Sequence, residues 1–430
     1  RFQKLGKSEP YGKMSSSLGP EAFILQNFVL SPIELVCFVK CAAMTNGMTS
    51  STLCAILFFM FTKSNPAMAQ QIYSFLNLFR LDIDPMERLL LINFEKDADT
   101  TYIGFEPQVF DDSVNGKGHL VIGWRLDGQV DVFHQPSLKI DPRKYNIAGK
   151  GLANSVEQAF DEAHYEINDF GVQAFYRFKD IYNRAILLKI NEKNPKKRKP
   201  FGLLAPMGAA AEHPSSMPLV LLHDFYFVRK KETTIEISID GKIHRPDELP
   251  IPMDGTKMLF TRYSPSPLIV TFNPAADEML VPIEIEQGTT QFTTGEYDFE
   301  LEWANDRPAL NRIVRNNGIY PVELRFVPPF PDLQSPDIPA KSKGGFEIEG
   351  HPATGRIIGH YIIENKADET SITLVPSKGW KPRPDKFSLR FLYTVARVFK
   401  KWPTTYEWTA IVTKTANGPH HLQSNWRRTK

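Results

Sequence analysis

Short apolar or alternating runs, each closed by a turn residue, recur along the chain from about residue 102 onward. Two pairs of such runs are separated by an Asp-Gly dipeptide: residues 119–125 and 129–135 around Asp127-Gly128, and residues 233–239 and 242–244 around Asp240-Gly241. Glycine accepts the positive φ of tight turns, so this arrangement predicts β-hairpins. The number and spacing of the runs predict an all-β, mainly antiparallel fold of barrels or sandwiches.

Helical patterns are few. We expect short helices over residues 85–91 and 154–163, and a longer one over residues 387–399 that ends before Pro403. In the last segment Leu392, Val395, Val398 and Phe399 suggest one apolar stripe. An extended conformation of this segment is the alternative.

The chain has 430 residues, which is more than one hydrophobic core usually organises. We therefore expect two β-barrel or β-sandwich domains in tandem with a few short helices, over residues 70–275 and 276–430. The boundary is placed at residues 271–277, where Pro274 and two alanines interrupt the strand pattern. A single large β architecture is the alternative.

The first 69 residues have the features of a leader or anchor region. An uncharged apolar run over residues 53–61 has the length of a signal-peptide core, and Ala67-Met68-Ala69 follows as a small-x-small cleavage pattern. We expect cleavage after Ala69 and an exported protein, whether periplasmic, secreted or at the cell surface. A retained anchor and a folded or untranslated segment are the alternatives, because starts at Met44 or Met48 leave no basic residue before the core.

Cysteine usage and charge narrow the function classes. The three cysteines, Cys37, Cys41 and Cys54, all precede Ala69, which excludes thiol chemistry and disulfides from the expected mature fold and suits an oxidising compartment. The formal charge of +2 gives no overall footprint for nucleic acid or an anionic membrane. The dense basic run at residues 196–199 is interpreted as a solvated loop. We expect no stable membrane span in the mature chain.

Adjacent His223 and Asp224 interrupt an apolar run over residues 218–228. A strand that is apolar on both faces is typical of a covered position, and burying such groups costs free energy unless they are hydrogen-bonded, paired or used in a site. Neighbouring strand residues point to opposite faces, so these two residues require a bulge to form one dyad. They are candidate catalytic residues, and satisfied structural positions are the alternative.

Other candidates follow from the same parity argument. His134 shares a face with Val130 and Val132, and Glu192 shares one with Ile186, Leu188 and Ile190, so both are candidate catalytic residues at strand ends. The candidate ligand-binding residues are aromatic, cationic or paired polar side chains: Trp124, Tyr226, Arg177, His164 and Glu166. Core packing and solvated surface are the alternative interpretations.

The sequence lacks the G-x-S-x-G, P-loop, H-E-x-x-H and calcium-loop motifs, and we expect no cofactor and no metal. Our leading hypothesis is an exported β-barrel or sandwich protein that binds an apolar or amphiphilic small molecule, lipid-like or isoprenoid-like. It either only holds this ligand or also acts on it by acid/base chemistry. A carbohydrate-active enzyme with two carboxylates among Glu166, Glu192 and Asp224, and a noncatalytic surface or assembly module, are the alternatives.

Overall fold

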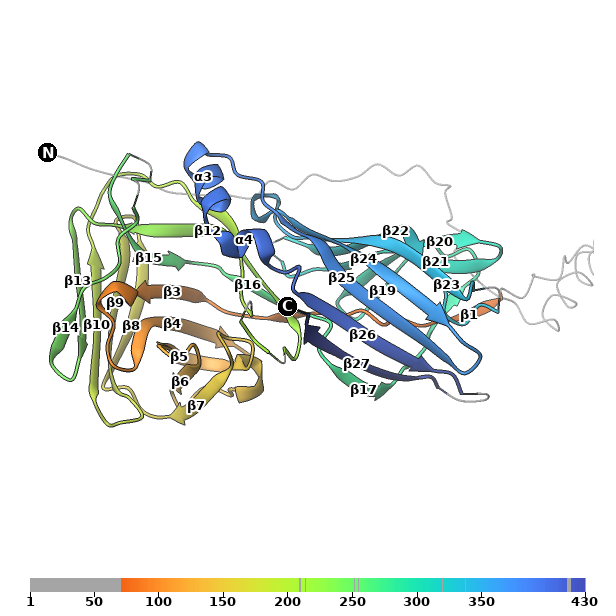
Figure 1. Cartoon of the computed structure of the whole chain (residues 1–430), viewed down its shortest axis with the longest axis horizontal. Helices are drawn as coiled ribbons and strands as arrows, with labels where there is room; N and C mark the ends of the chain where they lie inside the picture. The colour runs from red at the N-terminus through yellow and green to blue at the C-terminus, as the bar shows by residue number, and fades with distance from the viewer. Residues whose placement is uncertain are drawn as a thin grey trace, which may run out of the picture. The chain divides into compact units, whose positions relative to one another are not determined.

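The computed structural model describes residues 71–429, with gaps at residues 209, 213, 251, 254, 319, 337 and 416–418 and without the side chains of residues 397 and 398. The chain from Gln71 onward forms one compact unit of β-sheets with few helices (Figure 1). This architecture confirms the predicted fold class. The expected leader, residues 1–69, lies outside the described residues.

The first ten-stranded sheet has the order β2-β16-β12-β15-β3-β4-β5-β6-β7, and β11 pairs with β12. All its pairs are antiparallel except β6 with β7. Its strands are β2 (Leu81–Asp84), β3 (Arg88–Asn93), β4 (Tyr102–Asp112), β5 (Gly116–Arg125), β6 (Val130–His134), β7 (Leu152–Glu157), β11 (Phe201–Ala205), β12 (Met217–Arg229), β15 (Met258–Ser264) and β16 (Leu268–Phe272).

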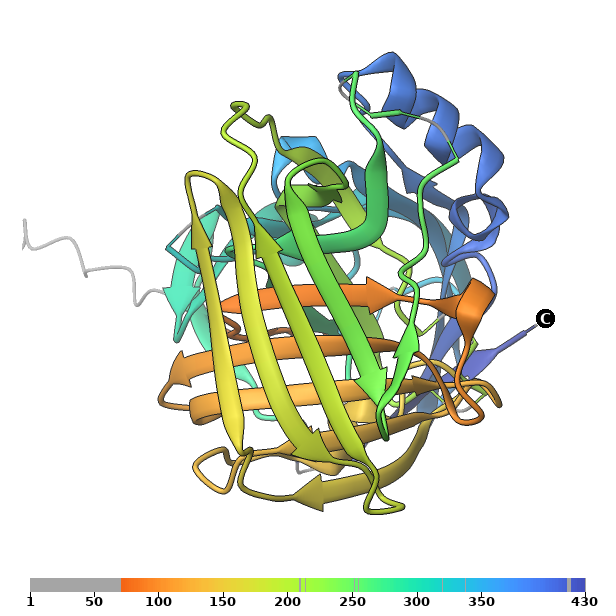
Figure 2. The same ribbon diagram turned by 90° about the vertical axis from the view of Figure 1, so that its left-hand side faces the viewer.

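A five-stranded sheet of order β14-β13-β10-β9-β8 packs on part of the first sheet. Its strands are β8 (Glu162–Asn168), β9 (Gly171–Lys179), β10 (Ala185–Glu192), β13 (Thr233–Ile239) and β14 (Lys242–His244). The apolar side chains between the two sheets include Phe105 and Val121 from the first sheet and Tyr176 and Leu188 from the five-stranded sheet. Figure 2 shows the strands of this sheet crossing in front of those of the first.

The second ten-stranded sheet is wholly antiparallel, with the order β17-β27-β26-β25-β24-β23-β22-β21-β20-β19. Its strands are β17 (Ala276–Met279), β19 (Gln291–Thr294), β20 (Tyr297–Ala304), β21 (Arg307–Arg315), β22 (Val322–Phe330), β23 (Lys341–Glu349), β24 (Arg356–Asn365), β25 (Glu369–Lys381), β26 (Tyr406–Thr413) and β27 (His421–Arg428). A separate pair joins β1 (Ile72–Phe75) to β18 (Ile283–Glu286).

Helical structure is limited to short segments. The α-helices are α3 (Phe387–Val395) and α4 (Arg397–Lys401), and the 3-10 helices are η1 (Glu95–Asp97), η2 (Pro142–Tyr145) and η3 (Pro352–Thr354). The helix expected over residues 387–399 is therefore present but broken at Ala396. Its apolar stripe is only partly as expected, because Val395 is 58% exposed whereas Leu389 and Tyr393 are buried.

Two expected helices are strands instead. Residues 154–163 contain most of β7 and the start of β8, and residues 85–91 run into β3. In both places the segment gains a strand partner from a distant part of the chain, because β7 pairs with β6 and β3 pairs with β4 and β15. Tertiary pairing therefore overrides the weak local helical pattern.

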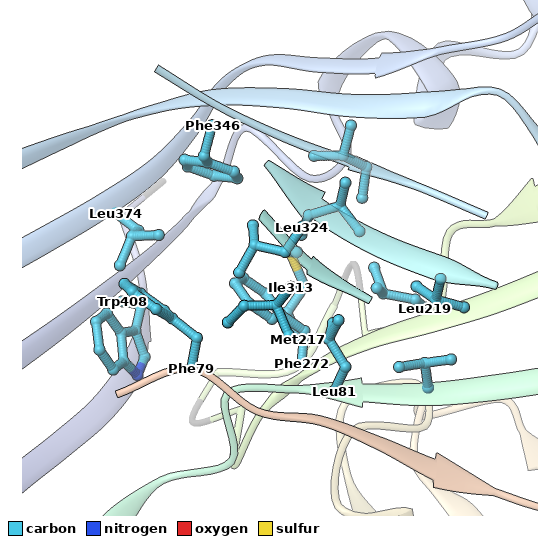
Figure 3. Close-up of a cluster of buried hydrophobic side chains, with 14 of the residues drawn as sticks. Phe79, Leu81, Met217, Leu219, Phe272, Ile313, Leu324, Phe346, Leu374 and Trp408 are labelled. Carbon is cyan, nitrogen blue, oxygen red and sulfur yellow. The ribbon is translucent and has the colours of Figure 1, made fainter. Parts of the chain in front are cut away.

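Both ten-stranded sheets contribute side chains to one hydrophobic core (Figure 3). The ring of Phe79, which precedes β2, lies 4.8 Å from the ring of Phe326 on β22 and 5.0 Å from that of Phe330. The chain crosses from the first sheet to the second between Phe272 and Ala276, within the segment where the sequence suggests a boundary.

Candidate functional site

A cavity of about 1030 Å³ opens beside the first ten-stranded sheet. Most of its wall is apolar and comes from β3, β4, β5, β11, β12 and β15, including Phe105, Ile122 and Phe225. Helices α3 and α4 add Leu389, Tyr393 and neighbouring side chains on another side. The volume of this cavity is at the upper end of the range for ligand pockets, so an apolar molecule of lipid size fits in it.

Glu106 is the carboxyl group buried in this wall. It lies in the middle of β4 and is 3% exposed. Its Oε1 accepts a hydrogen bond from Nε2 of Gln108 at 2.8 Å, and its Oε2 accepts one from Nε1 of Trp124 at 3.0 Å. Burial raises the pKa of Glu106 to about 7, although these hydrogen bonds and the charge of Arg262 oppose the rise. The group therefore exchanges its proton near neutral pH.

Trp124 and Gln108 hold the Glu106 carboxyl group and also line the cavity. Gln108 shares a strand face with Glu106 because the two residues are two positions apart on β4. Its Oε1 is buried and has no hydrogen-bond partner among the described residues. An acceptor in this state is available to a donor group on a ligand, since leaving it unpaired costs free energy.

Arg262 on β15 brings a positive charge to the same cavity. Its Nη1 donates hydrogen bonds to the backbone oxygen of Phe260 at 2.8 Å and to Oδ1 of Asn93. Burial lowers the pKa of Arg262 to about 10, and the nearby Glu106 carboxylate opposes this shift. The guanidinium group therefore remains charged at neutral pH and can bind an anionic or carbonyl oxygen.

Charged residues surround the more exposed part of the cavity wall. Lys144 forms an ion pair with Asp84 at 2.8 Å, and Arg80 forms one with Asp82 at 2.8 Å. All four side chains line the cavity together with its apolar interior. The wall thus combines an apolar body with polar groups at two places, which suits an amphiphilic ligand.

His223 and Asp224 lie in a second polar cluster, at a bulge in β12. Leu222 pairs with Leu203 and Phe225 pairs with Phe201, so two residues of β12 face Gly202 alone. This is the irregularity that a His-Asp dyad requires, and Nε2 of His223 lies 3.9 Å from Oδ2 of Asp224.

Side chains from other strands complete this second cluster. Oγ of Ser264 donates a hydrogen bond to Oδ1 of Asp224 at 2.5 Å. The His223 ring lies 4.9 Å from the ring of Tyr320 and 5.1 Å from that of His351. Burial lowers the pKa of His351, and the neighbouring His223 acts in the same direction. His223 and Asp224 do not line the large cavity.

Glu192 is fully buried and satisfied by neighbouring groups. It accepts a hydrogen bond from the backbone nitrogen of Arg229 at 2.9 Å and pairs with Nη2 of Arg198 at 2.9 Å. Burial raises its pKa, although both interactions oppose the rise. Arg198 comes from the basic run at residues 196–199, so this run is not only a solvated loop.

The interactions of Glu192 extend through Arg198 and Tyr263 to Tyr226, another of the predicted site residues. Arg198 donates a hydrogen bond to the hydroxyl of Tyr263, whose ring stacks on that of Tyr226 with centroids 5.3 Å apart. The strand-face assignment of Glu192 is confirmed, since Ile186, Leu188 and Ile190 are buried on the same face. Glu192 and Tyr226 thus belong to a packed network outside the large cavity.

The remaining predicted residues lie elsewhere. His134 is buried, with Nδ1 3.3 Å from the backbone oxygen of Gln135. His164 and Glu166 are exposed on β8, with Nε2 and Oε2 3.8 Å apart, opposite the buried Tyr165. The exposed Arg177 lies over the Phe175 ring at 5.7 Å and pairs with Glu162 at 3.7 Å. The structure therefore does not gather His134, Glu192 and His223 in one pocket.

Sequence reasoning missed Glu106, Gln108 and Arg262. All the predicted site residues lie in the described part of the chain, and among them Trp124 alone lines the cavity. Glu106 carries the same signal that drew attention to His223 and Asp224, because it is a carboxyl group within the largely apolar run Phe105 to Phe110. The nearness of Arg262 to Glu106 has no such signal in the sequence, because it depends on the pairing of β15 with β3 and of β3 with β4.

Comparisons with known proteins identify no relative of this chain. No protein-family model, curated protein or solved structure matches the chain. Among the residues that the structure describes, no three or more His, Cys, Asp and Glu side chains are grouped so that they could hold a metal ion. Within the same residues, no helix is long and apolar enough to cross a bilayer.

Proposed function

We propose that this chain binds an apolar or amphiphilic small molecule, lipid-like or isoprenoid-like, in the large cavity and acts on it by acid/base chemistry at Glu106. The observation that carries the proposal is a buried carboxyl group with a pKa of about 7 in the wall of an apolar cavity of about 1030 Å³. A group that titrates near the working pH is suited to both accepting and donating a proton.

Four polar side chains of the cavity wall have roles in this proposal. Glu106 exchanges a proton with the ligand, and Trp124 and Gln108 fix the orientation of its carboxyl group. Arg262 binds a carbonyl or carboxylate oxygen of the ligand and stabilises negative charge on it. The apolar wall binds the hydrocarbon part and excludes water, which strengthens both interactions. Export of the protein, expected from residues 53–69, belongs to the same proposal.

Binding of cis-parinaric acid, a fluorescent fatty acid, tests the ligand class. We expect one saturable site on the full chain. Ala205 lines the cavity on β11, so Ala205→Phe fills part of the space and should weaken binding at least about tenfold. Val281→Phe adds the same ring at a position that is 83% exposed and should leave binding unchanged. Equal binding by all three proteins would show that the fatty acid does not occupy this cavity.

The pH dependence of the same binding tests the role of Glu106. An ionised Glu106 repels the carboxylate of the probe, so affinity should fall about tenfold as the pH rises through about 7. Glu106→Gln should bind the probe equally across this range. A second arm follows deuterium uptake from solvent into β-ionone, an isoprenoid ketone, which should slow at least about a hundredfold in the variant. No uptake by the unaltered protein would refute the acid/base role.

A further inference from the structure

Helix α3 is apolar on two faces. Its inner face carries Leu389 and Tyr393, which are buried and line the cavity. Its outer face carries Phe387, Phe391 and Val395, which are 82%, 45% and 58% exposed. These three residues are four positions apart and therefore form one stripe along the helix. Figures 1 and 2 show α3 at the periphery of the unit.

The chain around this helix is strongly basic. Residues 378–401 contain eight lysines and arginines and one acidic residue, Asp385, so the segment has a formal charge of 8 − 1 = +7, whereas the whole chain has +2. The exposed basic residues are Lys378, Lys381, Arg383, Arg390, Lys400 and Lys401. Arg383 pairs with Glu349 at 2.5 Å. The near balance of the total charge thus conceals a local concentration of positive charge.

Other exposed apolar residues do not share this setting. Val281 and Ile411, for example, lie in the loop after β17 and on β26, outside the basic segment at residues 378–401. Single exposed apolar residues are ordinary on protein surfaces, but a stripe of two aromatic rings and a valine on one helix is not. The stripe and the basic residues therefore call for a common partner that is both apolar and negatively charged.

We propose that the outer face of α3 docks on a membrane surface that contains anionic lipid. Phenylalanine and valine side chains on a basic amphipathic helix insert at the boundary between headgroups and acyl chains, while lysines and arginines attract anionic headgroups. An acidic protein surface would satisfy the charges but would leave most of the exposed Phe387 ring without an apolar environment. A lipid surface satisfies both.

Docking at this place also brings the cavity to the source of an apolar ligand. The inner face of the docked helix is a wall of the cavity, so a molecule leaving the lipid layer has a short path into it. Delivery of a ligand by this path rests on the proposed function. Docking itself rests only on the exposed stripe and the charge around it.

Vesicle sedimentation with the full chain tests the proposal. We expect binding to phosphatidylcholine vesicles that contain phosphatidylserine, little binding to phosphatidylcholine alone, and loss of binding at high salt. Two variants should each weaken binding at least about tenfold: Phe387→Ser with Phe391→Ser, and Arg390→Gln with Lys400→Gln and Lys401→Gln. Val281→Ser with Ile411→Ser is the matched control and should bind as the unaltered protein does.

Three outcomes would overturn docking through α3. The first is equal binding by all the variants, which would assign the membrane contact to another segment, such as the apolar residues 53–61. The second is equal binding to both kinds of vesicle. The third is a dimer in light scattering that the Phe387→Ser, Phe391→Ser variant abolishes, which would make a second copy the occupant of the stripe.

Binding of cis-parinaric acid without vesicles separates this inference from the proposed function. The α3 variants should keep this binding and an unchanged circular dichroism spectrum, because their substituted side chains are exposed. Vesicle binding without fatty-acid binding would retain the docking and refute the proposed function. Loss of both activities only in the α3 variants would mean that the helix supports the cavity wall rather than a lipid contact.

Discussion

Glu106 retains its proton to near neutral pH because the surrounding wall offers an ionised carboxylate little solvation. The carboxyl group still has two hydrogen-bond donors, Gln108 and Trp124. Its raised pKa therefore reflects burial rather than missing partners.

The raised pKa of Glu106 has a consequence for stability. The folded protein holds this proton more tightly than the unfolded chain does, so the stabilising contribution is complete below about pH 4.5 and is lost as the pH rises through about 7. The loss amounts to about 3 kcal/mol at most. Glu106→Gln should match the unaltered protein near pH 4 and exceed it in stability above about pH 7.

Urea unfolding at several pH values measures this difference. Gln can replace Glu at this position because the amide of Gln108 can turn and present its unpaired Oε1 to the new NH₂ group. Glu166→Gln, at an exposed carboxyl on β8, is the control and should not change the profile. If the free energy of unfolding changed with pH in the same way for Glu106→Gln and the unaltered protein, the raised pKa of Glu106 would be contradicted.

At the scale of elements, β11 is held between η3 and α3. A Cβ atom added at Gly202 would lie 2.0 Å from the backbone oxygen of Ala353, and the oxygen of Gly202 accepts a hydrogen bond from Tyr393 at 2.6 Å. The missing side chain lets η3 approach β11, and the backbone of β11 in turn anchors α3. The position of α3 on the cavity wall thus depends on a glycine.

Substitution at Gly202 should therefore loosen this part of the molecule. Gly202→Ala forces β11 and η3 apart and should lower the free energy of unfolding by about 1–3 kcal/mol. Gly345→Ala on β23 is the control, because its nearest atom, the oxygen of Val327, is 3.4 Å away. Denaturant unfolding measures both. A Gly202→Ala protein as stable as the control variant would show that β11 moves without cost.

At the scale of the molecule, the two ten-stranded sheets share one core. Phe79, Leu81 and Phe272 from the first half pack in the same cluster as Ile313, Leu324 and Trp408 from the second (Figure 3). Neither sheet covers these side chains alone. Such a core links the stability of one sheet to that of the other.

This shared core predicts one cooperative unfolding transition. Phe79 is 1% exposed, so Phe79→Ala should cost about 3–5 kcal/mol and shift the transition of both sheets together. Hydrogen-exchange mass spectrometry can follow peptides of β4 and β25 separately during urea unfolding. Two separated transitions, with only one moved by the substitution, would indicate independent domains.

The class of fold and many of its strands follow from the amino-acid sequence alone. Alternating strands and Asp-Gly turns have local causes, and the predicted hairpins β5–β6 and β13–β14 are present. The faces of Glu192 and of His164 with Glu166 also followed from parity alone, since successive strand side chains alternate.

Which side chains meet depends instead on how distant strands pair and pack. The cavity unites Glu106 on β4, Trp124 on β5 and Arg262 on β15, and their nearness depends on pairing and curvature of a sheet that draws on distant segments. The helices expected over residues 85–91 and 154–163 are wrong for the same reason. Pairing with distant strands outweighs the local sequence pattern there and gives β3 and β7 instead. Strand periodicity is a local property of the chain, whereas a site assembled across strands depends on long-range contacts that a single sequence does not specify.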